Sequence, residues 1–309
     1  MRRLRALAAV AVLVWLGSAL PASSQQIITE KSVNLDEANR LAARLRGHGL
    51  TVIMTRSGDS NPSLAQRGRM GGQGDVLISV HNNSSTSAAA RGTEVYAQVA
   101  NGTSAQLARR IHDGIVRRAG TPARGVKRRV GQNGDYYGVL RNSPVPAVIV
   151  EGAFLSNPTD ARLLASPDFR QRVADGIADG VLGQFVSAAP RGPGPTKPLE
   201  RLGNGLVSAP AGLAASTSGR DVHLSWQGVP LANFYEVWRD GNLVGTTPNR
   251  QYDDRGASFG GHHYDVRAVM GAEGARLGVG PSAGIDVALG RVVIDPGHGG
   301  SDSGAVGRI

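Results

Sequence analysis

The sequence predicts an α/β fold, a layered and mostly parallel sheet flanked by helices, together with a smaller all-β sandwich. The first observation is a set of short apolar runs, at 76–80, 148–150 and 292–294, that are rich in Val and Ile. Unbroken runs of this kind are typical of strands buried on both faces, as in parallel sheets. The second is that helical patterns alternate with these runs, as in layered α/β proteins. The third is a change to short alternating strands after residue 206.

The elements of the α/β part follow in order along residues 26–187. Residues 34–46 carry apolar side chains at helical spacing and end beside Gly47 and Gly49, so a helix is expected there. The patterns then predict a strand at 50–55, a short helix at 64–70, strands at 76–80 and 92–97, a helix at 104–119, a strand at 144–150, and helices at 159–165 and 168–186. The basic stretch at 120–142 is expected to be a long loop, which either borders the cleft or is simply solvated. His48 and His112 lie away from any motif and are expected on the surface.

The first 25 residues have the pattern of a secretory signal peptide. Arg2, Arg3 and Arg5 precede an apolar run at 7–16, and small residues follow at 18–22. The run is too short for a transmembrane helix, and no later segment is apolar enough to span a bilayer. We therefore expect an exported protein of the periplasm, cell envelope or exterior, with no membrane span after signal cleavage. The alternative is that this segment stays uncleaved as a membrane anchor. The chain has no Cys, which excludes disulfides and thiolate metal ligands.

The net charge of +10 is unevenly distributed. Residues 26–187 hold 20 Lys and Arg against 13 Asp and Glu, a balance of +7, whereas residues 207–287 hold 6 against 8, a balance of −2. A basic region on an exported protein suits an anionic envelope polymer, through long-range attraction. It could equally reflect a genome that favours Arg over Lys. Nucleic acid is not expected as a partner, because the Arg residues are scattered and no nucleic-acid motif is present.

The segment 188–206 holds four Pro and four Gly, which is typical of a linker. Residues 207–287 then show short alternating strands and a hairpin signal at 240–242. This pattern resembles a fibronectin type III sandwich, in which Trp226 would be the core tryptophan and Tyr264 the tyrosine of a late strand. His262 and His263 are adjacent in a strand, so they point to opposite faces and are expected to be structural.

Three of the apolar runs end at residues able to do chemistry. The first two are followed by His81 and Glu151, and the third leads through Pro296 and Gly297 to His298 on a glycine-rich loop. Ligands of open α/β sheets collect at the carboxyl ends of strands. A single such residue is usually only a solvated loop residue. Three together predict a metal site or an acid–base site.

Four motifs in separate elements carry a family resemblance. They are Glu30–Leu35, Ser79–Ser84, Glu151–Asn157 and the last stretch, Val292–Ala305. Together they resemble the zinc-dependent N-acetylmuramoyl-L-alanine amidase family of the Amidase_3 type. The resemblance covers 26–187, the main part of a catalytic domain, and 290–309, its first strand and His loop.

The resemblance implies a zinc ion held by His298, Glu30 and His81, with Glu151 as the general base. Zinc with three protein ligands lowers the pKa of a bound water to about 7. Asp295 would either accept a hydrogen bond from a ligand imidazole or cap the turn, and Asn83 would brace its loop. The implied partner is peptidoglycan, in which the bond between N-acetylmuramic acid and L-alanine would be hydrolysed. Two other readings are a peptidoglycan-binding protein without activity and a different zinc peptidase such as a carboxypeptidase.

The order of the motifs departs from the family, in which the Asp-Pro-Gly-His segment comes first. Here it comes last, at 295–298. The amidase region therefore resembles a circular permutation in which the sandwich joins the old ends, and permutation is tolerated where termini lie close together at the surface. Alternatively, residues 290–309 begin a second, truncated amidase, or the order is an artefact of sequence assembly. The sequence does not indicate an oligomeric state.

Overall fold

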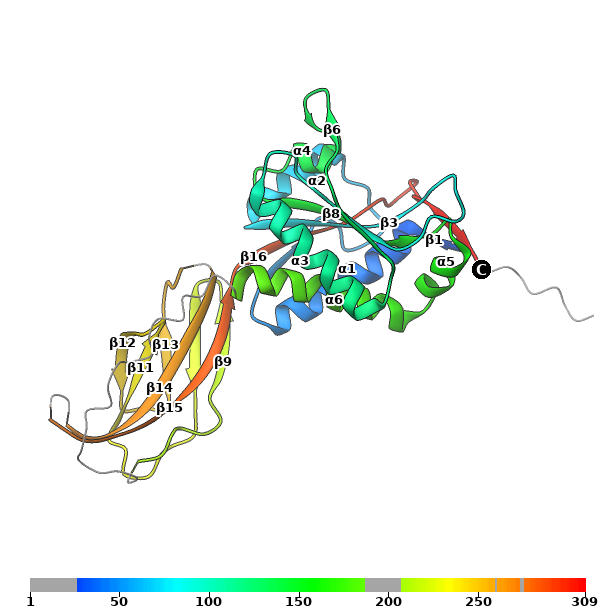
Figure 1. Cartoon of the computed structure of the whole chain (residues 1–309). Helices are drawn as coiled ribbons and strands as arrows, with labels where there is room; N and C mark the ends of the chain where they lie inside the picture. Colours follow the sequence, from blue (N-terminus) through cyan, green and yellow to red (C-terminus); the bar gives the residue numbers. More distant parts are fainter. Residues whose placement is uncertain (1–26, 187–206, 259, 273–274) are drawn as a thin grey trace, which may run out of the picture.

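The structure is a computed structural model that describes residues 27–186, 207–258, 260–272 and 275–309. The predicted signal peptide at 1–25 and the predicted linker at 188–206 lie outside the described residues. Among the helices within those ranges, none is long and apolar enough to cross a membrane. Two main bodies of secondary structure are visible in Figure 1, a layered α/β part and an all-β part.

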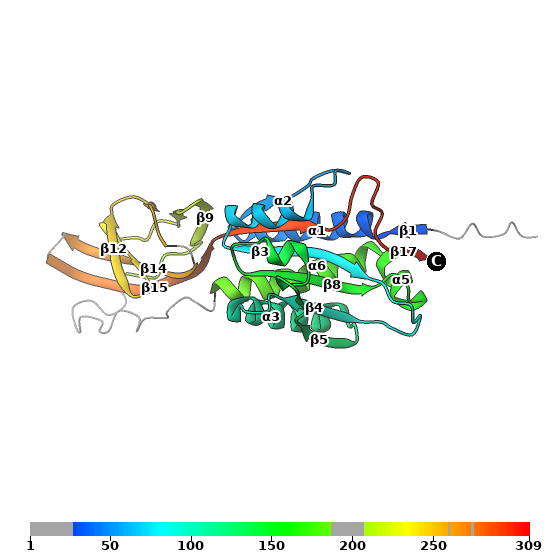
Figure 2. The same cartoon turned by 90° about the horizontal axis from the view of Figure 1, so that it is seen from above.

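A six-stranded mixed sheet forms the centre of the α/β part, and the predicted α/β fold with flanking helices is confirmed for this part. Its strands, in spatial order, are β2 (Thr51–Met54), β16 (Arg291–Pro296), β3 (Val76–Asn83), β8 (Ala147–Phe154), β4 (Thr93–Ala97) and β5 (Ala123–Lys127). All neighbouring pairs are parallel except β4 and β8, which are antiparallel. Figure 2 looks onto this sheet and shows β3, β8, β4 and β5 side by side.

Helices cover both faces of the sheet (Figure 1). The main hydrophobic core lies between one face and three long helices, α1 (Glu30–Gly47), α3 (Gly102–Ala119) and α6 (Pro167–Val186). A smaller core on the other face includes Leu77, Ile149 and Val293 and is covered by α2 (Leu64–Met70) and α4 (Gly138–Arg141). The remaining elements of this part are η1 (Gly71–Gln73), α5 (Pro158–Ala165), and the short strand pairs β1 (Ile27–Thr29) with β17 (Val306–Arg308) and β6 (Val130–Gly131) with β7 (Gly134–Asp135).

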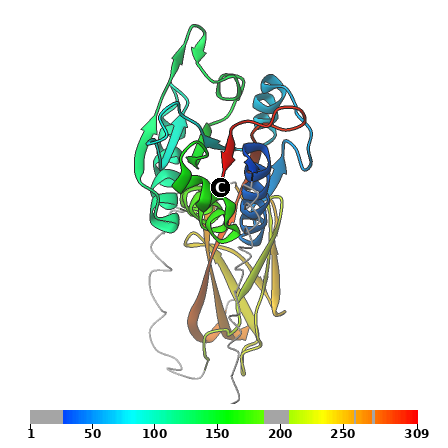
Figure 3. The ribbon, with the colours of Figure 1, turned by 90° about the vertical axis from the view of Figure 1, so that its right-hand side faces the viewer.

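A strand from near the end of the sequence, β16, lies inside the sheet. β16 pairs in parallel with β2 on one side and with β3 on the other, and Val292, Val293 and Ile294 are fully buried. After the loop that follows, β17 pairs antiparallel with β1, so that Arg308 lies opposite Ile27. Figure 3 shows the red end of the chain beside the blue start of α1. Both strands of segment 290–309 therefore pair with strands of residues 27–186, β16 within the six-stranded sheet and β17 in a separate pair with β1.

Residues 207–289 form two antiparallel sheets around a second hydrophobic core. One sheet has the order β13-β10-β9 and the other β12-β11-β14-β15. The strands are β9 (Ala214–Ser218), β10 (Asp221–Ser225), β11 (Phe234–Arg239), β12 (Asn242–Thr247), β13 (Gln251–Asp254), β14 (Gly260–Ala272) and β15 (Ala275–Leu289). The predicted core residues Trp226 and Tyr264 are both buried. His262 and His263 hydrogen-bond to different carboxylates, Asp240 and Asp286, each at 2.6 Å.

Two local predictions need correction. The stretch 120–142 is not a plain loop, because β5 pairs with β4 and is followed by the β6–β7 hairpin and α4. His112 is not a surface residue: it is buried, and its Nε2 accepts a hydrogen bond from the backbone N–H of Gly125 at 3.0 Å. Both errors have one cause. The polar chain after α3 folds back as an edge strand and covers the face of α3 that carries His112.

A buried ion pair supports the loop that leaves β16. Asp295 and Arg67 are almost fully buried, and their side chains are 3.0 Å apart. Asp295 also accepts hydrogen bonds from Thr55 Oγ1 at 2.6 Å and Ser79 Oγ at 2.7 Å. Arg67 donates to the backbone carbonyls of Pro296 at 2.7 Å and His298 at 2.9 Å. The pair thus joins α2 and three strands to the loop.

Removal of β16 should unfold the α/β part. A chain that stops after Gly290 lacks this fully buried strand, which leaves β2 and β3 without the hydrogen-bonded neighbour between them, so we expect no cooperative thermal transition for this part. A control chain that stops after Ala305 loses only the peripheral β17 and should melt cooperatively. Scanning calorimetry measures both. An unchanged melting curve for the shorter chain would mean that residues 291–309 belong to a separate domain.

Asp295→Ala should be strongly destabilising, because it leaves the Arg67 guanidinium buried without its carboxylate. Breaking one side of a buried pair typically costs about 3–5 kcal/mol. Urea unfolding measured by circular dichroism tests this. Asp59→Ala is the control, since Asp59 forms an exposed ion pair with Lys31 and should change stability little. Equal, small effects in both variants would show that the buried pair does not support the loop.

Candidate metal centre

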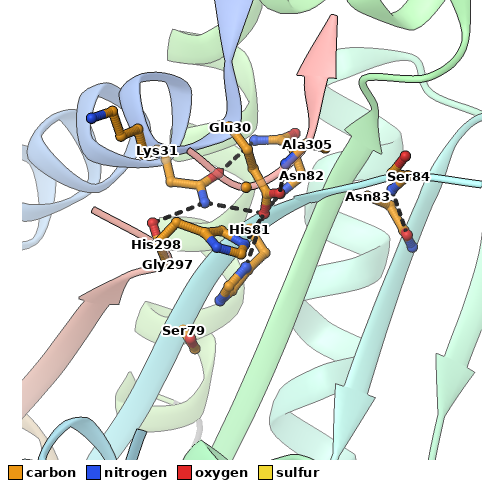
Figure 4. Close-up of polar contacts among 12 residues, drawn as sticks. Glu30, Lys31, Ser79, His81, Asn82, Asn83, Ser84, Gly297, His298 and Ala305 are labelled. Carbon is orange, nitrogen blue, oxygen red and sulfur yellow. Dashed lines mark hydrogen bonds and ion pairs between the residues drawn. The ribbon is translucent and has the colours of Figure 1, made fainter. Parts of the chain in front are cut away.

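Three of the four predicted site residues converge on one point. Glu30 is the first residue of α1, His81 lies near the end of β3, and His298 lies in the loop after β16. Oε1 of Glu30 is 3.0 Å from Nδ1 of His81 and 3.1 Å from Nε2 of His298. Figure 4 shows the three side chains pointing toward one another. One ligand atom from each lies within 4.8 Å of the others, a spacing that can hold a metal ion.

Glu30 is held in place from several sides. Its backbone N–H donates to Ala305 O at 2.8 Å, and its Oε2 accepts from the N–H of Ala305 at 2.8 Å. Oε1 accepts from Asn34 Nδ2 and from the backbone N–H of Asn82, each at 3.3 Å. Burial raises the pKa of the Glu30 carboxyl, but hydrogen bonds from His298 and His81 outweigh it and hold this pKa well below its usual range. Glu30 is therefore an ionised carboxylate.

The His298 loop orients one imidazole nitrogen toward Glu30. Nδ1 of His298 is 2.8 Å from Oδ2 of Asp302, which leaves Nε2 directed at the carboxylate. The hydrogen bond to Glu30 and the contact with Asp302 raise the pKa of His298 to about 9. Asp295 was a candidate for this role, and the structure assigns the contact to Asp302, because Asp295 is buried beneath the loop against Arg67. The sequence signal for this contact is that Asp302 follows His298 by four residues in a glycine-rich loop.

Glycine is required where the loop passes the histidines. A Cβ on Gly297 would lie 2.0 Å from Cε1 of His81, a contact that no side chain could make. Gly304 has φ of +62°, and a Cβ there would lie 2.6 Å from both Oε2 of Glu30 and Cδ2 of His298. The loop backbone therefore approaches the two ligand candidates as closely as glycine allows.

Glu151 lies beside the three residues, on β8. It pairs in register with His81 of the neighbouring strand. Burial raises the pKa of the Glu151 carboxyl well above its usual range, and the charges of Glu30 and Glu94 raise it further. Its Oε2 has no hydrogen-bond partner among the described residues. Glu151 thus differs from Glu30: the environment raises the pKa of one carboxyl and lowers that of the other.

All four predicted residues line one cavity of about 290 Å³. Its remaining lining residues are Leu64, Asn82, Asn83, Ser84, Tyr137, Gly138, Val139 and Ile149. The expectation that the 120–142 stretch borders the cleft is met by Tyr137, Gly138 and Val139. A second cavity of about 360 Å³, which includes Asn61, Arg67 and Asp302, shares His81 and His298 with the first.

Two buried residues near His81, Glu94 and Asn82, have supporting roles that the sequence does not predict. Asn83 was expected to brace its loop, and its Nδ2 donates to Glu94 Oε1 at 2.8 Å. Glu94 was not singled out, although it is buried and also bound by Arg124 and Lys127. Asn82, buried behind His81, was also missed. These roles depend on residues that are close in space but not in the sequence, so the sequence pattern does not reveal them.

The donor set fits zinc. Two imidazole nitrogens and one carboxylate oxygen that face a common point from three elements are a known ligand set of catalytic zinc sites, in which a further position stays open. The ionised state of Glu30 suits a ligand, since metals bind the deprotonated carboxylate. Asp302 on the far nitrogen of His298 is the kind of support that ligand histidines have.

Comparisons with known proteins identify the family of the chain. The Amidase_3 family model, described as N-acetylmuramoyl-L-alanine amidase, matches residues 17–183, which is more than half of the chain. The N-acetylmuramoyl-L-alanine amidase LytC of Bacillus subtilis is 34% identical over 164 residues, which cover 51% of this chain and 32% of LytC. The probable cell wall amidase LytH of Staphylococcus epidermidis is 35% identical over 158 residues, 51% of this chain and 50% of LytH.

Among solved structures, the catalytic domain of CwlV, an amidase from Bacillus (Paenibacillus) polymyxa var. colistinus, is 36% identical. The match covers 49% of this chain and 82% of that one, with a TM-score of 0.45. The chain spans a third to a half of the length of LytC and LytH. The match to the family model ends before 290–309, so the place of that segment rests on the structure. By the family match over more than half of its length, this chain belongs to the Amidase_3 family of N-acetylmuramoyl-L-alanine amidases.

Proposed function

We propose that this chain is a zinc-dependent N-acetylmuramoyl-L-alanine amidase that hydrolyses the bond between N-acetylmuramic acid and L-alanine in peptidoglycan. The observation that carries the proposal is the convergence of Glu30, His81 and His298 on one point, with Glu151 in the same cavity. Family membership and the amidase names of LytC and LytH support the reaction class.

In this proposal the chain's own residues divide the work. Glu30, His81 and His298 hold the zinc ion, and zinc when bound supplies a Lewis acid that polarises the scissile carbonyl and activates water. Glu151 is the general base: its unpartnered Oε2 takes the proton of the attacking water and returns it to the amide nitrogen that leaves as an amine. The raised pKa of Glu151 makes its carboxylate a stronger proton acceptor than that of an exposed glutamate. Leu64, Tyr137 and Val139 contribute apolar side chains to the lining of this cavity.

We further propose that residues 26–187 and 290–309 are one catalytic domain in permuted order. The position of β16 between β2 and β3 supports this proposal. The pairing of β17 with β1 supports it as well, because it brings the end of segment 290–309 next to the start of residues 26–187. Residues 207–287 would then be a fibronectin type III-like domain inserted between them. The two antiparallel sheets, the buried Trp226 and the buried Tyr264 support this assignment.

We propose an exported protein that acts in the cell envelope. The signal-peptide pattern of residues 1–25 and the description of LytH as a probable cell wall amidase support this location. The positive balance of residues 26–187 would favour association with an anionic wall polymer.

Digestion of purified sacculi tests the reaction. An amidase exposes the free amino group of L-alanine, whereas a carboxypeptidase releases a C-terminal amino acid and a wall-binding protein releases nothing. Mass spectrometry of the soluble products, after labelling of new amino groups, separates the three outcomes. We expect labelled L-alanine at the new N-terminus. Release of free amino acids alone would overturn the proposed reaction.

Zinc binding should depend on each of the three ligand candidates. His298→Ala, His81→Ala and Glu30→Ala each leave two protein ligands, which is fewer than catalytic zinc sites use, so stoichiometric zinc should be lost. Plasma mass spectrometry after dialysis measures the metal content. His48→Ala is the control, since this exposed histidine lies in the described part of the chain but outside the cluster. A variant that retains full zinc would exclude its residue from the ligand set.

Glu151→Gln should separate zinc binding from chemistry. The amide keeps the shape of the side chain but cannot accept the proton of water, so we expect a folded, zinc-loaded protein that still binds sacculi. General-base catalysis contributes about 10²–10⁴-fold, and turnover should fall by at least that factor. Product release from labelled sacculi gives the rate. Turnover close to that of the unmodified chain would rule out Glu151 as the base.

A further inference from the structure

A buried polar chain runs from the candidate metal centre into the core of the α/β part. Glu30, Asn34 and Glu37 lie on one face of α1 at helical spacing. Asn34 and Glu37 are fully buried, and Asn82 of β3 is 1% exposed. Asn34 Nδ2 donates to Glu30 Oε1 and to Gly297 O, each at 3.3 Å. This helix face, which would otherwise pack as apolar core, therefore carries three polar groups.

Asn82 is the centre of this chain. Its Nδ2 donates to Asn34 Oδ1 at 3.1 Å and to Glu37 Oε2 at 3.0 Å. Its Oδ1 accepts from the backbone N–H of Ala153 at 3.1 Å, and its own backbone N–H donates to Glu30 Oε1 at 3.3 Å. Figure 4 shows Asn82 next to Glu30 and His81. One side chain thus connects the three elements that carry Glu30, His81 and Glu151.

The orientation of the Asn82 amide follows from its neighbours. A backbone N–H can only donate, so the side of Asn82 that faces Ala153 must be the carbonyl. The NH₂ group then faces α1, where its two hydrogens need two acceptors. Asn34 supplies one and Glu37 the other. Without Glu37, one N–H of Asn82 would be buried without a partner.

A buried carboxyl at position 37 is energetically unfavourable. Its Oε1 has no hydrogen-bond partner among the described residues. Burial raises the pKa of its carboxyl to about 8, against the hydrogen bond from Asn82 and the charges of Arg170 on α6 and Arg40 on α1, while Asp36 raises it further. The carboxyl is therefore mainly neutral at pH 7. A leucine would fill the same space without burying an unpaired oxygen, so the contact with Asn82 is what Glu37 adds.

We propose that Glu37 is a positioning residue of the metal centre: it holds the amide of Asn82 in the orientation that links Glu30 to the strand of Glu151. The inference rests on the proposed zinc site. It assigns Glu37 no contact with substrate or metal. Its effect passes through Asn82 and Asn34, which fix the ligand carboxylate before metal binds. Supports of this kind typically change metal affinity by about 10–100-fold.

The test compares zinc affinity in Glu37→Leu, Glu37→Gln and Leu41→Ala, measured by competition with a fluorescent chelator. Glu37→Leu removes the acceptor and should weaken zinc binding by about 10–100-fold without lowering the melting temperature. Glu37→Gln keeps a carbonyl for Asn82 and should bind zinc like the unmodified chain. Leu41→Ala, which is fully buried on the same helix, should lower the melting temperature and leave zinc affinity unchanged. Unchanged zinc affinity in Glu37→Leu would overturn the proposal.

Two further measurements keep the outcome decisive. Asn82→Ala should weaken zinc binding as Glu37→Leu does, and the double variant should be no weaker than Asn82→Ala, because the two residues act through one contact. Additive losses would overturn the proposal. If the unmodified chain binds no zinc, the proposed function fails, and amide hydrogen exchange decides the positioning role. Faster exchange at the Ala153 N–H in Glu37→Leu, but not in Leu41→Ala, supports it, and equal exchange overturns it.

Discussion

The α/β part depends on the insertion of β16 between β2 and β3. A central strand has backbone hydrogen bonds on both edges and side chains on both faces, so its three apolar residues are completely excluded from water. The same strand ends at the loop that presents His298. The interaction that completes the hydrophobic core is therefore also the one that brings a residue from the end of the sequence to Glu30 near its start. The insertion of β16 therefore completes both the sheet and the site.

Charge is distributed in this site so that neighbouring carboxyls have opposite tendencies. Hydrogen bonds from two histidines lower the pKa of Glu30, whereas burial and like charges raise the pKa of Glu151. Separation of this kind is the general way in which two carboxyls take different roles in one active site. Glu94, bound by Arg124 and Lys127, contributes to it, because its negative charge raises the pKa of Glu151. The distinction between ligand and base thus follows from the environment of each group.

Below the site, polar groups are buried in two places with different partners. Asp295 and Arg67 form an ion pair whose remaining hydrogen bonds are made by side-chain hydroxyls and loop carbonyls. Among the residues that the structure describes, no cation lies within hydrogen-bond distance of Glu37, which contacts an amide instead. The first arrangement holds the loop of His298 from one face of the sheet, and the second holds Glu30 and His81 from the other. The metal centre is supported from both sides by groups that do not belong to it.

The sequence by itself determined the elements and the chemistry they carry. Apolar runs are buried wherever strands form, so the strands that lead to His81, Glu151 and His298 could be read from local pattern, as could the motifs that identify the family. Only the tertiary structure decided which side chains meet. Asp302 rather than Asp295 contacts His298. His112 is covered by a strand that the pattern of its own helix does not predict. Asn82 links three elements. Such contacts join residues far apart in the chain, and they depend on how the sheet is packed, which local periodicity does not encode.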